Sequence, residues 1–178
     1  LPDPMYDPRV VLEPTITIAE PWMWGLVAVL VGGTAWLSRK RPDWGLATVA
    51  AAMPLYQVRG ELFGLPTTLL ELLLGAVLVG LISRWVFAGA PGPKEAFRRT
   101  PYDIWIGVFA LGSLVAALAS GDIREGLGLW RAFIIEPVLF FYAVTFVFQK
   151  RDPKPLLAGA LGALAVLAVW TGYLLLDG

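Results

Sequence analysis

The chain of 178 residues contains no cysteine and no histidine. Without cysteine it can form no disulfide, and it has no thiolate to act as nucleophile or metal ligand. Without histidine it lacks the most common general base in enzymes and the imidazole ligands of zinc sites. We therefore expect no metal site and no cofactor in this chain.

Charged residues are also scarce. They make up 16% of the chain, whereas 57% is hydrophobic, and the mean hydropathy is +0.69. Soluble domains average about 25% charged and about 45–50% apolar residues, so this composition indicates a membrane protein. The formal net charge is zero and there is no basic tail, which argues against nucleic acid as a partner and favours membrane lipids.

Six apolar segments predict an all-α, polytopic transmembrane bundle of about six spanning helices, forming one domain over residues 1–178. A polar, proline-rich segment over residues 1–20 precedes them. The expected helices are Pro21–Leu37, Trp44–Tyr56, Thr67–Phe87, Tyr102–Ala119, Leu127–Phe148 and Pro155–Leu176. The first residue is Leu, and the last helix ends almost at Gly178. We therefore expect the N-terminal part of a larger polytopic protein.

The distribution of Lys and Arg predicts which side of the membrane each loop occupies. If all six helices cross, ten of these 14 residues lie on one side, and both termini lie outside the cytoplasm. The ten are Arg39, Lys40, Arg41, Arg84, Lys94, Arg98, Arg99, Lys150, Arg151 and Lys154. The second helix is short, about 20 Å at ~1.5 Å per residue, against a hydrocarbon core of ~30 Å. If it only re-entered the membrane, the division would be eight against six, so six crossings is the better interpretation.

The four basic residues left on the outer side are Arg9, Arg59, Arg124 and Arg131. Insertion bias does not explain them. Arg59, Arg124 and Arg131 on one face predict a clamp for a diphosphate, because a planar guanidinium matches phosphate oxygens bidentately. The simpler alternatives are local pairs, Arg59 with Glu61 and Arg124 with Asp122 or Glu125, and an Arg131 side chain that extends to the interface.

Two acidic residues lie inside predicted helices. Glu71 is near the start of the third helix, and Glu136 lies within the fifth, next to Pro137. A carboxylate inside the membrane has to be neutral, hydrogen-bonded or paired with a cation. Arg131 paired with Glu71 or Glu136 is the simplest such arrangement. It is either structural, or it holds an arginine in the orientation that grips an anionic ligand.

Three groups of residues resemble the amino-terminal half of the O-antigen ligase and O-antigen polymerase family. They are Pro54–Arg59 with Leu65–Glu71, Thr100–Asp103, and Gly126–Phe133 with Glu136-Pro137. The resemblance covers roughly Met53 to Phe148. It implies a polytopic bacterial plasma-membrane glycosyltransferase that takes a glycan from undecaprenyl diphosphate on the periplasmic side. It also implies that Arg59 and Arg131 engage the diphosphate.

The chain departs from that family in two respects. Family members have about twice as many helices, and a large external loop in their later half carries a histidine thought to be catalytic. This chain has no histidine. The resemblance therefore implies part of the donor site, with a C-terminal half as the missing partner. The alternatives are a non-enzymatic lipid-binding or transporter-like subunit and a purely structural membrane module.

Overall fold

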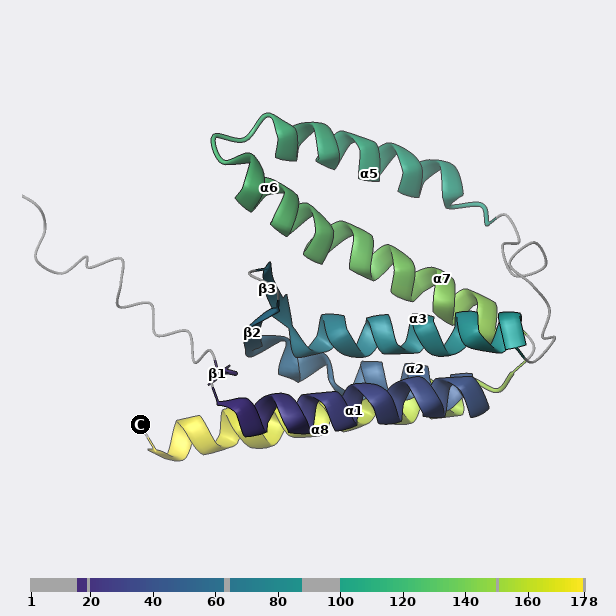
Figure 1. The fold of residues 1–178 in the computed structure, drawn as a ribbon, viewed down its shortest axis with the longest axis vertical. Helices are drawn as coiled ribbons and strands as arrows, with labels where there is room; N and C mark the ends of the chain where they lie inside the picture. The colour runs from purple at the N-terminus through teal and green to yellow at the C-terminus, as the bar shows by residue number, and fades with distance from the viewer. Residues whose placement is uncertain (1–15, 19, 63–64, 88–99, 150, 178) are drawn as a thin grey trace, which may run out of the picture.

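The computed structural model describes residues 16–18, 20–62, 65–87, 100–149 and 151–177 (Figure 1). The fold is almost entirely helical. The α-helices are α1 (Pro21–Lys40), α2 (Pro42–Ala51), α3 (Leu69–Phe87), α5 (Asp103–Leu118), α6 (Ile123–Trp130), α7 (Glu136–Phe148) and α8 (Lys154–Asp177). The 3₁₀-helix η1 (Met53–Gln57) follows α2, and the π-helix η2 (Arg131–Ile135) joins α6 to α7. Three short strands complete the described elements: β1 (Ile16–Thr17), β2 (Val58–Leu62) and β3 (Leu65–Thr68).

Four helical segments are long and apolar enough to cross a bilayer, which makes this a helical membrane protein. They are α1, α3, the continuous helix Ile123–Phe148 and α8. Helix α5 has 16 residues and α2 only 10, which is about 15 Å of helix. The crossing of the membrane by all six expected helices therefore stays a prediction.

The second expected helix, Trp44–Tyr56, is shorter than predicted at its C-terminal end. The α-helix begins at Pro42, whose fixed φ suits the first helical position, and ends at Ala51. Pro54 lacks an N–H and disfavours the α conformation at the residue before it, so the chain continues as the 3₁₀-helix η1. The expected helix is therefore two elements.

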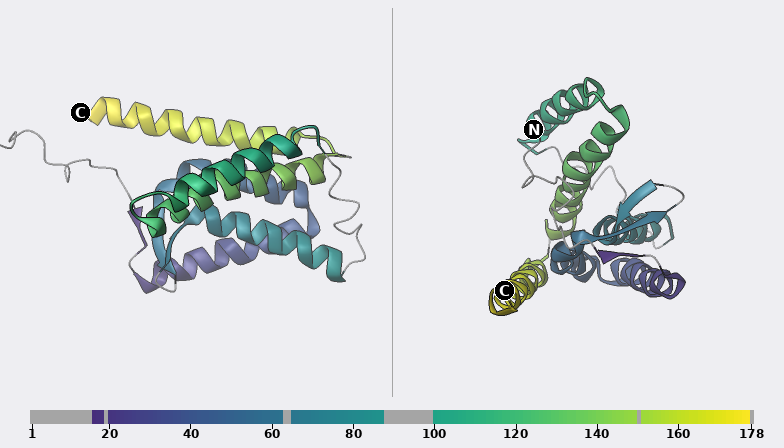
Figure 2. Two further views of the ribbon diagram at one scale, coloured as in Figure 1. Left: turned by 90° about the horizontal axis from the view of Figure 1, so that it is seen from above. Right: turned by 90° about the vertical axis from the view of Figure 1, so that its left-hand side faces the viewer.

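This short helix lies at the centre of the bundle. Helix α2 contacts α1, α3, α7 and α8, and Leu46 is fully buried with Val49 beside it in the main hydrophobic cluster. The end-on view in Figure 2 shows α1 and α3 grouped around α2, with α8 on another side. A helix of only 10 residues thus forms the core against which the longer helices pack.

Small residues allow these helices to approach closely. A Cβ atom added at Gly80 of α3 would lie 2.6 Å from the Ser38 Cβ of α1, and one added at Gly159 of α8 would lie 2.3 Å from the Ala47 carbonyl oxygen. Gly159 belongs to the run Ala158–Ala163, whose small residues four positions apart favour close packing of helices. Ser38 is fully buried, and its hydroxyl donates to the Thr34 carbonyl oxygen at 2.7 Å.

A β-hairpin, which the sequence analysis did not predict, connects η1 to α3. Strands β2 and β3 pair antiparallel, so that Arg59 lies opposite Thr68, and β1 pairs parallel with β2. Trp24 of α1 covers Gly60, where an added Cβ would lie 3.0 Å from its ring. Helix α3 consequently begins at Leu69 rather than at Thr67.

Successive helices run in opposite directions, so their connections alternate between the two ends of the bundle (Figure 1). These two ends differ in charge. The C-terminal ends of α1 and α3 and the start of α8 carry Arg39, Lys40, Arg84 and Lys154 at one end. The hairpin and the start of α6 lie at the other end with Arg59 and Arg124. Arg9, Lys94, Arg98, Arg99 and Lys150 lie outside the described residues. The described basic residues are thus divided between the two ends as the distribution of Lys and Arg along the sequence predicts. The side of the membrane on which each end lies stays a prediction.

The contact between α2 and α8 predicts a position-specific effect on stability. Gly159→Val should lower the free energy of unfolding by about 1–3 kcal/mol, because the added atoms overpack the helix contact at Ala47. Gly162→Val is the matched control, since a Cβ added there meets nothing within 4 Å. Unfolding in mixed micelles measures both, and equal effects would show that the close approach is unimportant.

The absence of cysteine allows a direct test of the six crossings. The single-cysteine variants Glu20→Cys, Ser120→Cys and Asp152→Cys place one thiol at each of three exposed positions. With six crossings, an impermeant maleimide should label the Glu20→Cys and Ser120→Cys variants from the same side of sealed vesicles, and the Asp152→Cys variant from the other. Labelling of the first two variants from opposite sides would contradict six crossings, with α2 or α5, the two helices below spanning length, as the element that does not cross.

Candidate functional site

An ion pair joins the start of α3 to the middle of the helix Ile123–Phe148. The Arg131 Nη2 atom lies 3.0 Å from Glu71 Oε2, and the side chains are 40% and 22% exposed. The two residues are 60 positions apart in the sequence. The pairing of Arg131 with an acidic residue, which the sequence predicts as the simplest arrangement, is thus present, and the arginine side chain remains partly exposed.

Two threonines before α3 hold Glu71 in place. The Thr67 hydroxyl donates to Glu71 Oε2 at 3.0 Å, and the Glu71 backbone N–H donates to Thr68 Oγ1 at 3.2 Å. Thr68 therefore satisfies one of the N–H groups that a helix leaves without an intrahelical acceptor. The buried Thr67 gives the carboxylate a second donor besides Arg131.

The π-helix brings Glu136 to the same arginine. Pro137 has no N–H to donate back to Phe133, and the turn before it widens, so that the Glu136 N–H donates to the Arg131 carbonyl oxygen five residues back. In a regular α-helix residues five apart point about 140° away from each other. Here Arg131 Nε lies 3.9 Å from Glu136 Oε1. The π-turn thus places both carboxylates around one guanidinium.

The other two predicted arginines lie at the same end of the bundle and are exposed. Arg59 lies opposite Thr68 in the hairpin, and its carbonyl oxygen accepts from the Ile18 N–H at 2.8 Å. Arg124 lies in the first turn of α6, seven residues or about 10 Å before Arg131 and on a similar face of the helix. The side chain of Glu61, the alternative partner of Arg59, lies outside the described residues.

Asp122, one alternative partner of Arg124, has a structural role. Its Oδ1 atom accepts from the Glu125 N–H at 3.0 Å and caps α6.

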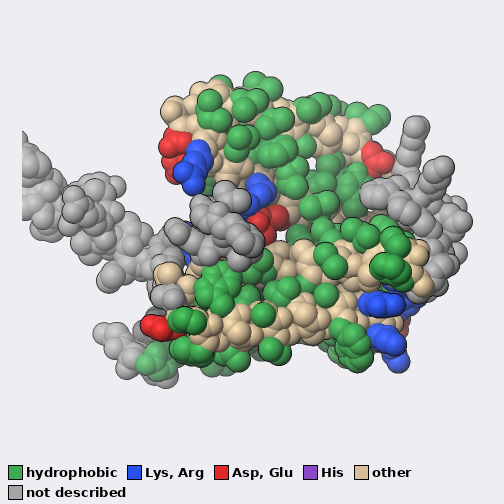
Figure 3. Space-filling model, in the orientation of Figure 1, with side chains coloured by type: hydrophobic (Ala, Val, Ile, Leu, Met, Phe, Trp, Pro, Cys, Tyr) green, Lys and Arg blue, Asp and Glu red, His purple; other side chains and the backbone are tan. Residues whose placement is uncertain are grey.

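Figure 3 shows basic and acidic side chains meeting in a recess between α3 and the hairpin of α5 with α6 and α7. Arg131, Glu71 and Glu136 together carry a formal charge of minus one. With Arg59 and Arg124 the five residues carry plus one.

A pocket lies beside Glu136. Its volume is about 330 Å³, and its walls come from α2, η1, α3, η2, α7 and α8. The lining residues are Val49, Met53, Leu70, Leu74, Ala132, Glu136, Pro137, Phe140, Phe141, Val144 and Leu156. Glu136 is the one charged residue among them. The pocket is thus apolar with a carboxylate at one place.

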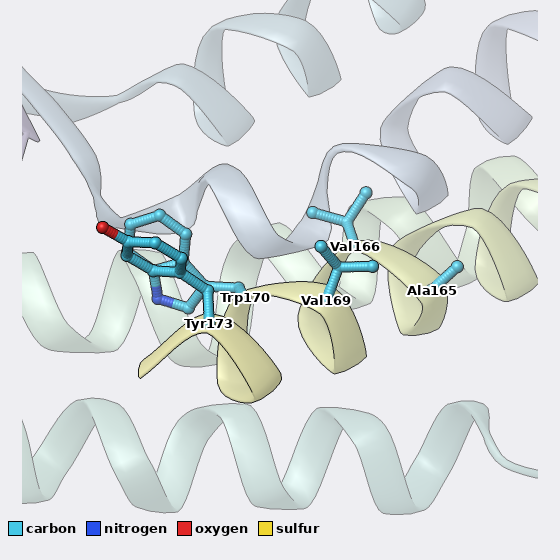
Figure 4. A pocket seen from close by; sticks show the side chains of 5 residues that line it. All are labelled: Ala165, Val166, Val169, Trp170 and Tyr173. Atoms are coloured by element: carbon cyan, nitrogen blue, oxygen red, sulfur yellow. The ribbon is translucent and has the colours of Figure 1, made fainter. Parts of the chain in front are cut away.

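A larger hollow of about 570 Å³ lies along α8, and its lining has fewer groups that could bind a polar ligand. Figure 4 shows its five lining side chains, which all come from α8 and include Trp170 and Tyr173 side by side. None of the five carries a charge. Among the residues that the structure describes, no group of three or more acidic side chains is arranged to hold a metal ion.

Three further polar contacts, which the sequence does not indicate, connect helices of the bundle. The Trp130 indole N–H donates to the Ala110 carbonyl oxygen at 3.0 Å, and the Tyr142 hydroxyl donates to Asp103 Oδ1 at 2.8 Å. Both tie α5 to the helix Ile123–Phe148. An ion pair between Arg151 and Asp43 ties the start of α2 to the segment before α8.

Comparison with protein families, with characterised proteins and with solved structures gave no match to this chain.

A double-mutant cycle measures the ion pair. Arg131→Ala, Glu71→Ala and the double variant should give a coupling energy of about 1–2 kcal/mol, because the two side chains are mostly buried and touch. The pair Lys154–Asp152 is the control, since its side chains are 85% and 55% exposed and its coupling should stay below about 0.5 kcal/mol. Equal coupling in the two cycles would contradict a structural role for Arg131.

Proposed function

We propose that this chain is the amino-terminal part of a membrane glycosyltransferase resembling O-antigen ligases and polymerases. It would lie in the bacterial plasma membrane as a multi-pass protein and cross it six times. Its outer end would bind a glycan donor carried on undecaprenyl diphosphate at the periplasmic face. The proposal rests on the resemblance described above together with the arrangement of the charged residues.

The observation that carries this proposal is the position of Arg131. It lies inside an apolar helix, yet its side chain is 40% exposed and held from two sides by Glu71 and Glu136. Two carboxylates that hold one guanidinium fix its orientation, and a planar guanidinium can present two parallel N–H groups to phosphate oxygens. Arg131 would therefore receive the diphosphate on the side that faces the outer end of the bundle.

Arg59 and Arg124 are required by the charge balance of this site. Arg131 with its two carboxylates carries a net negative charge, which by itself would repel a diphosphate. The two additional arginines bring further positive charge to the same end of the bundle. Glycan transfer breaks the bond between the sugar and the diphosphate, and positive groups arranged around the leaving oxygens stabilise the charge that develops there.

The remaining catalytic group would come from outside this chain. The resemblance places a histidine in a later external loop, so a C-terminal half would contribute the base that accepts the proton of the acceptor hydroxyl. The present chain would supply donor binding and stabilisation of the leaving group. Glu71 and Glu136 would act as positioning residues for Arg131.

Binding of a short isoprenyl diphosphate, farnesyl diphosphate, to the 178-residue chain in lipid nanodiscs tests this proposal. Arg59→Ala and Arg131→Ala should each weaken binding about tenfold, since a hydrogen bond to a charged group contributes about 1.5–3 kcal/mol. Glu71→Gln should instead strengthen it several-fold, because the glutamine carbonyl oxygen can still accept from Arg131 and Thr67 and hold the guanidinium in place, while the negative charge that repels the diphosphate is lost.

Arg39→Ala is the matched control, because Arg39 is exposed at the opposite end of the bundle. It should leave the dissociation constant unchanged. Calorimetry against empty nanodiscs removes the contribution of lipid partitioning. The proposal is wrong if farnesyl diphosphate binds equally to the wild type, Arg59→Ala and Arg131→Ala.

A further inference from the structure

The apolar pocket beside Glu136 has the size of a site for a small organic molecule. Its volume of about 330 Å³ corresponds to roughly ten groups of the size of a water molecule, at ~30 Å³ each. It extends along α7 from Glu136 to Val144, about 12 Å, between α3 on one side and Leu156 of α8 on the other. The pocket is therefore distinct from the outer-facing side of Arg131 to which we assign the diphosphate.

Glu136 gives this pocket its chemistry. The Glu136 side chain is 17% exposed, and its Oε1 atom is buried and accepts no hydrogen bond from the described residues. Oε1 lies 3.9 Å from Arg131 Nε, and the same side chain lines the pocket, so a molecule bound there would meet this carboxylate. A carboxylate in apolar surroundings is strongly stabilised by a donor or a cation.

The charges around Glu136 determine which class of ligand this pocket can bind. Arg131 makes its close contact, at 3.0 Å, with Glu71 Oε2, and it is 0.9 Å farther from Glu136, at 3.9 Å. The single positive charge is thus shared by two carboxylates, and the excess negative charge falls on Glu136. The aromatic rings of Phe140 and Phe141 also line the pocket, and ring faces attract organic cations.

We propose that this pocket binds an organic ammonium ion with an apolar body, whose charged group pairs with Glu136. The apolar body occupies the space between Leu70, Leu74 and Val144. A carboxylate ligand is disfavoured by Glu71 and Glu136, and a neutral alcohol leaves the excess charge in place. The ligand class follows from this charge balance and is independent of the proposed transferase function.

The test uses cyclohexylammonium, with cyclohexanol and cyclohexanecarboxylate as neutral and anionic probes of the same shape. Methyl NMR of the 178-residue chain in nanodiscs follows the leucine and valine signals. Cyclohexylammonium should saturably shift the methyls of Leu70, Leu74 and Val144, and the other two probes should bind at least about tenfold more weakly. Ala132→Leu, which fills part of the pocket and keeps the charges, should weaken cyclohexylammonium binding.

Charge variants separate this site from simple partitioning into lipid. Glu136→Gln should weaken cyclohexylammonium binding about tenfold. Glu71→Gln should also weaken it, because Arg131 then neutralises Glu136, whereas the same variant strengthens diphosphate binding. Glu125→Gln, an equal charge change on the exposed surface of α6, should have no effect.

Two outcomes would overturn the proposal. The first is that none of the three probes binds preferentially, which is the result if a proton rather than a ligand balances the charge of Glu136. Equal binding of all three probes would show that the pocket recognises only their apolar shape.

Discussion

The ion pair between Arg131 and Glu71 is the interaction on which the arrangement of this protein depends. A guanidinium in an apolar helix is costly in a membrane, by about 2.5–3.5 kcal/mol on insertion scales, unless it reaches a partner or water. Here the partner lies on a different helix, 60 residues earlier. The pair therefore joins α3 to the helix Ile123–Phe148 at the end of the bundle that carries the hairpin, and it brings the charged groups of two otherwise apolar elements to one place.

Local backbone chemistry on each side prepares this contact. On one side, Thr67 and Thr68 orient Glu71 at the first turn of α3 through two hydrogen bonds. On the other, the π-turn before Pro137 turns Glu136 toward the same arginine. Neither the threonine hydrogen bonds nor the π-turn requires long-range packing, because each involves residues close to one another in the sequence. π-Turns within α-helices are frequent at functional sites, and this one lies where the charges gather.

The short central helix explains how such a site can remain accessible in a small bundle. Helix α2 is only 10 residues long, so the chain leaves the bundle core early and forms η1 and the hairpin at the end opposite to Arg39 and Lys40. The hairpin places Arg59 opposite Thr68, next to the start of α3. Glycines at the helix contacts, such as Gly80 and Gly159, compensate for the small core by allowing backbone atoms to approach closely.

The sequence by itself determined the membrane character, the helices that become α1, α3, α5, Ile123–Phe148 and α8 within a few residues, and the need of Arg131 for an acidic partner. These features follow from apolar runs and from single residues whose burial is costly, and both can be read within one segment. Only the tertiary structure decided that Glu71 makes the closer contact with Arg131, that a hairpin follows the shortened second helix, and that Arg151 pairs with Asp43. Those outcomes depend on how distant helices pack, because contacts between residues 60 or 108 positions apart leave no periodic signal in either segment.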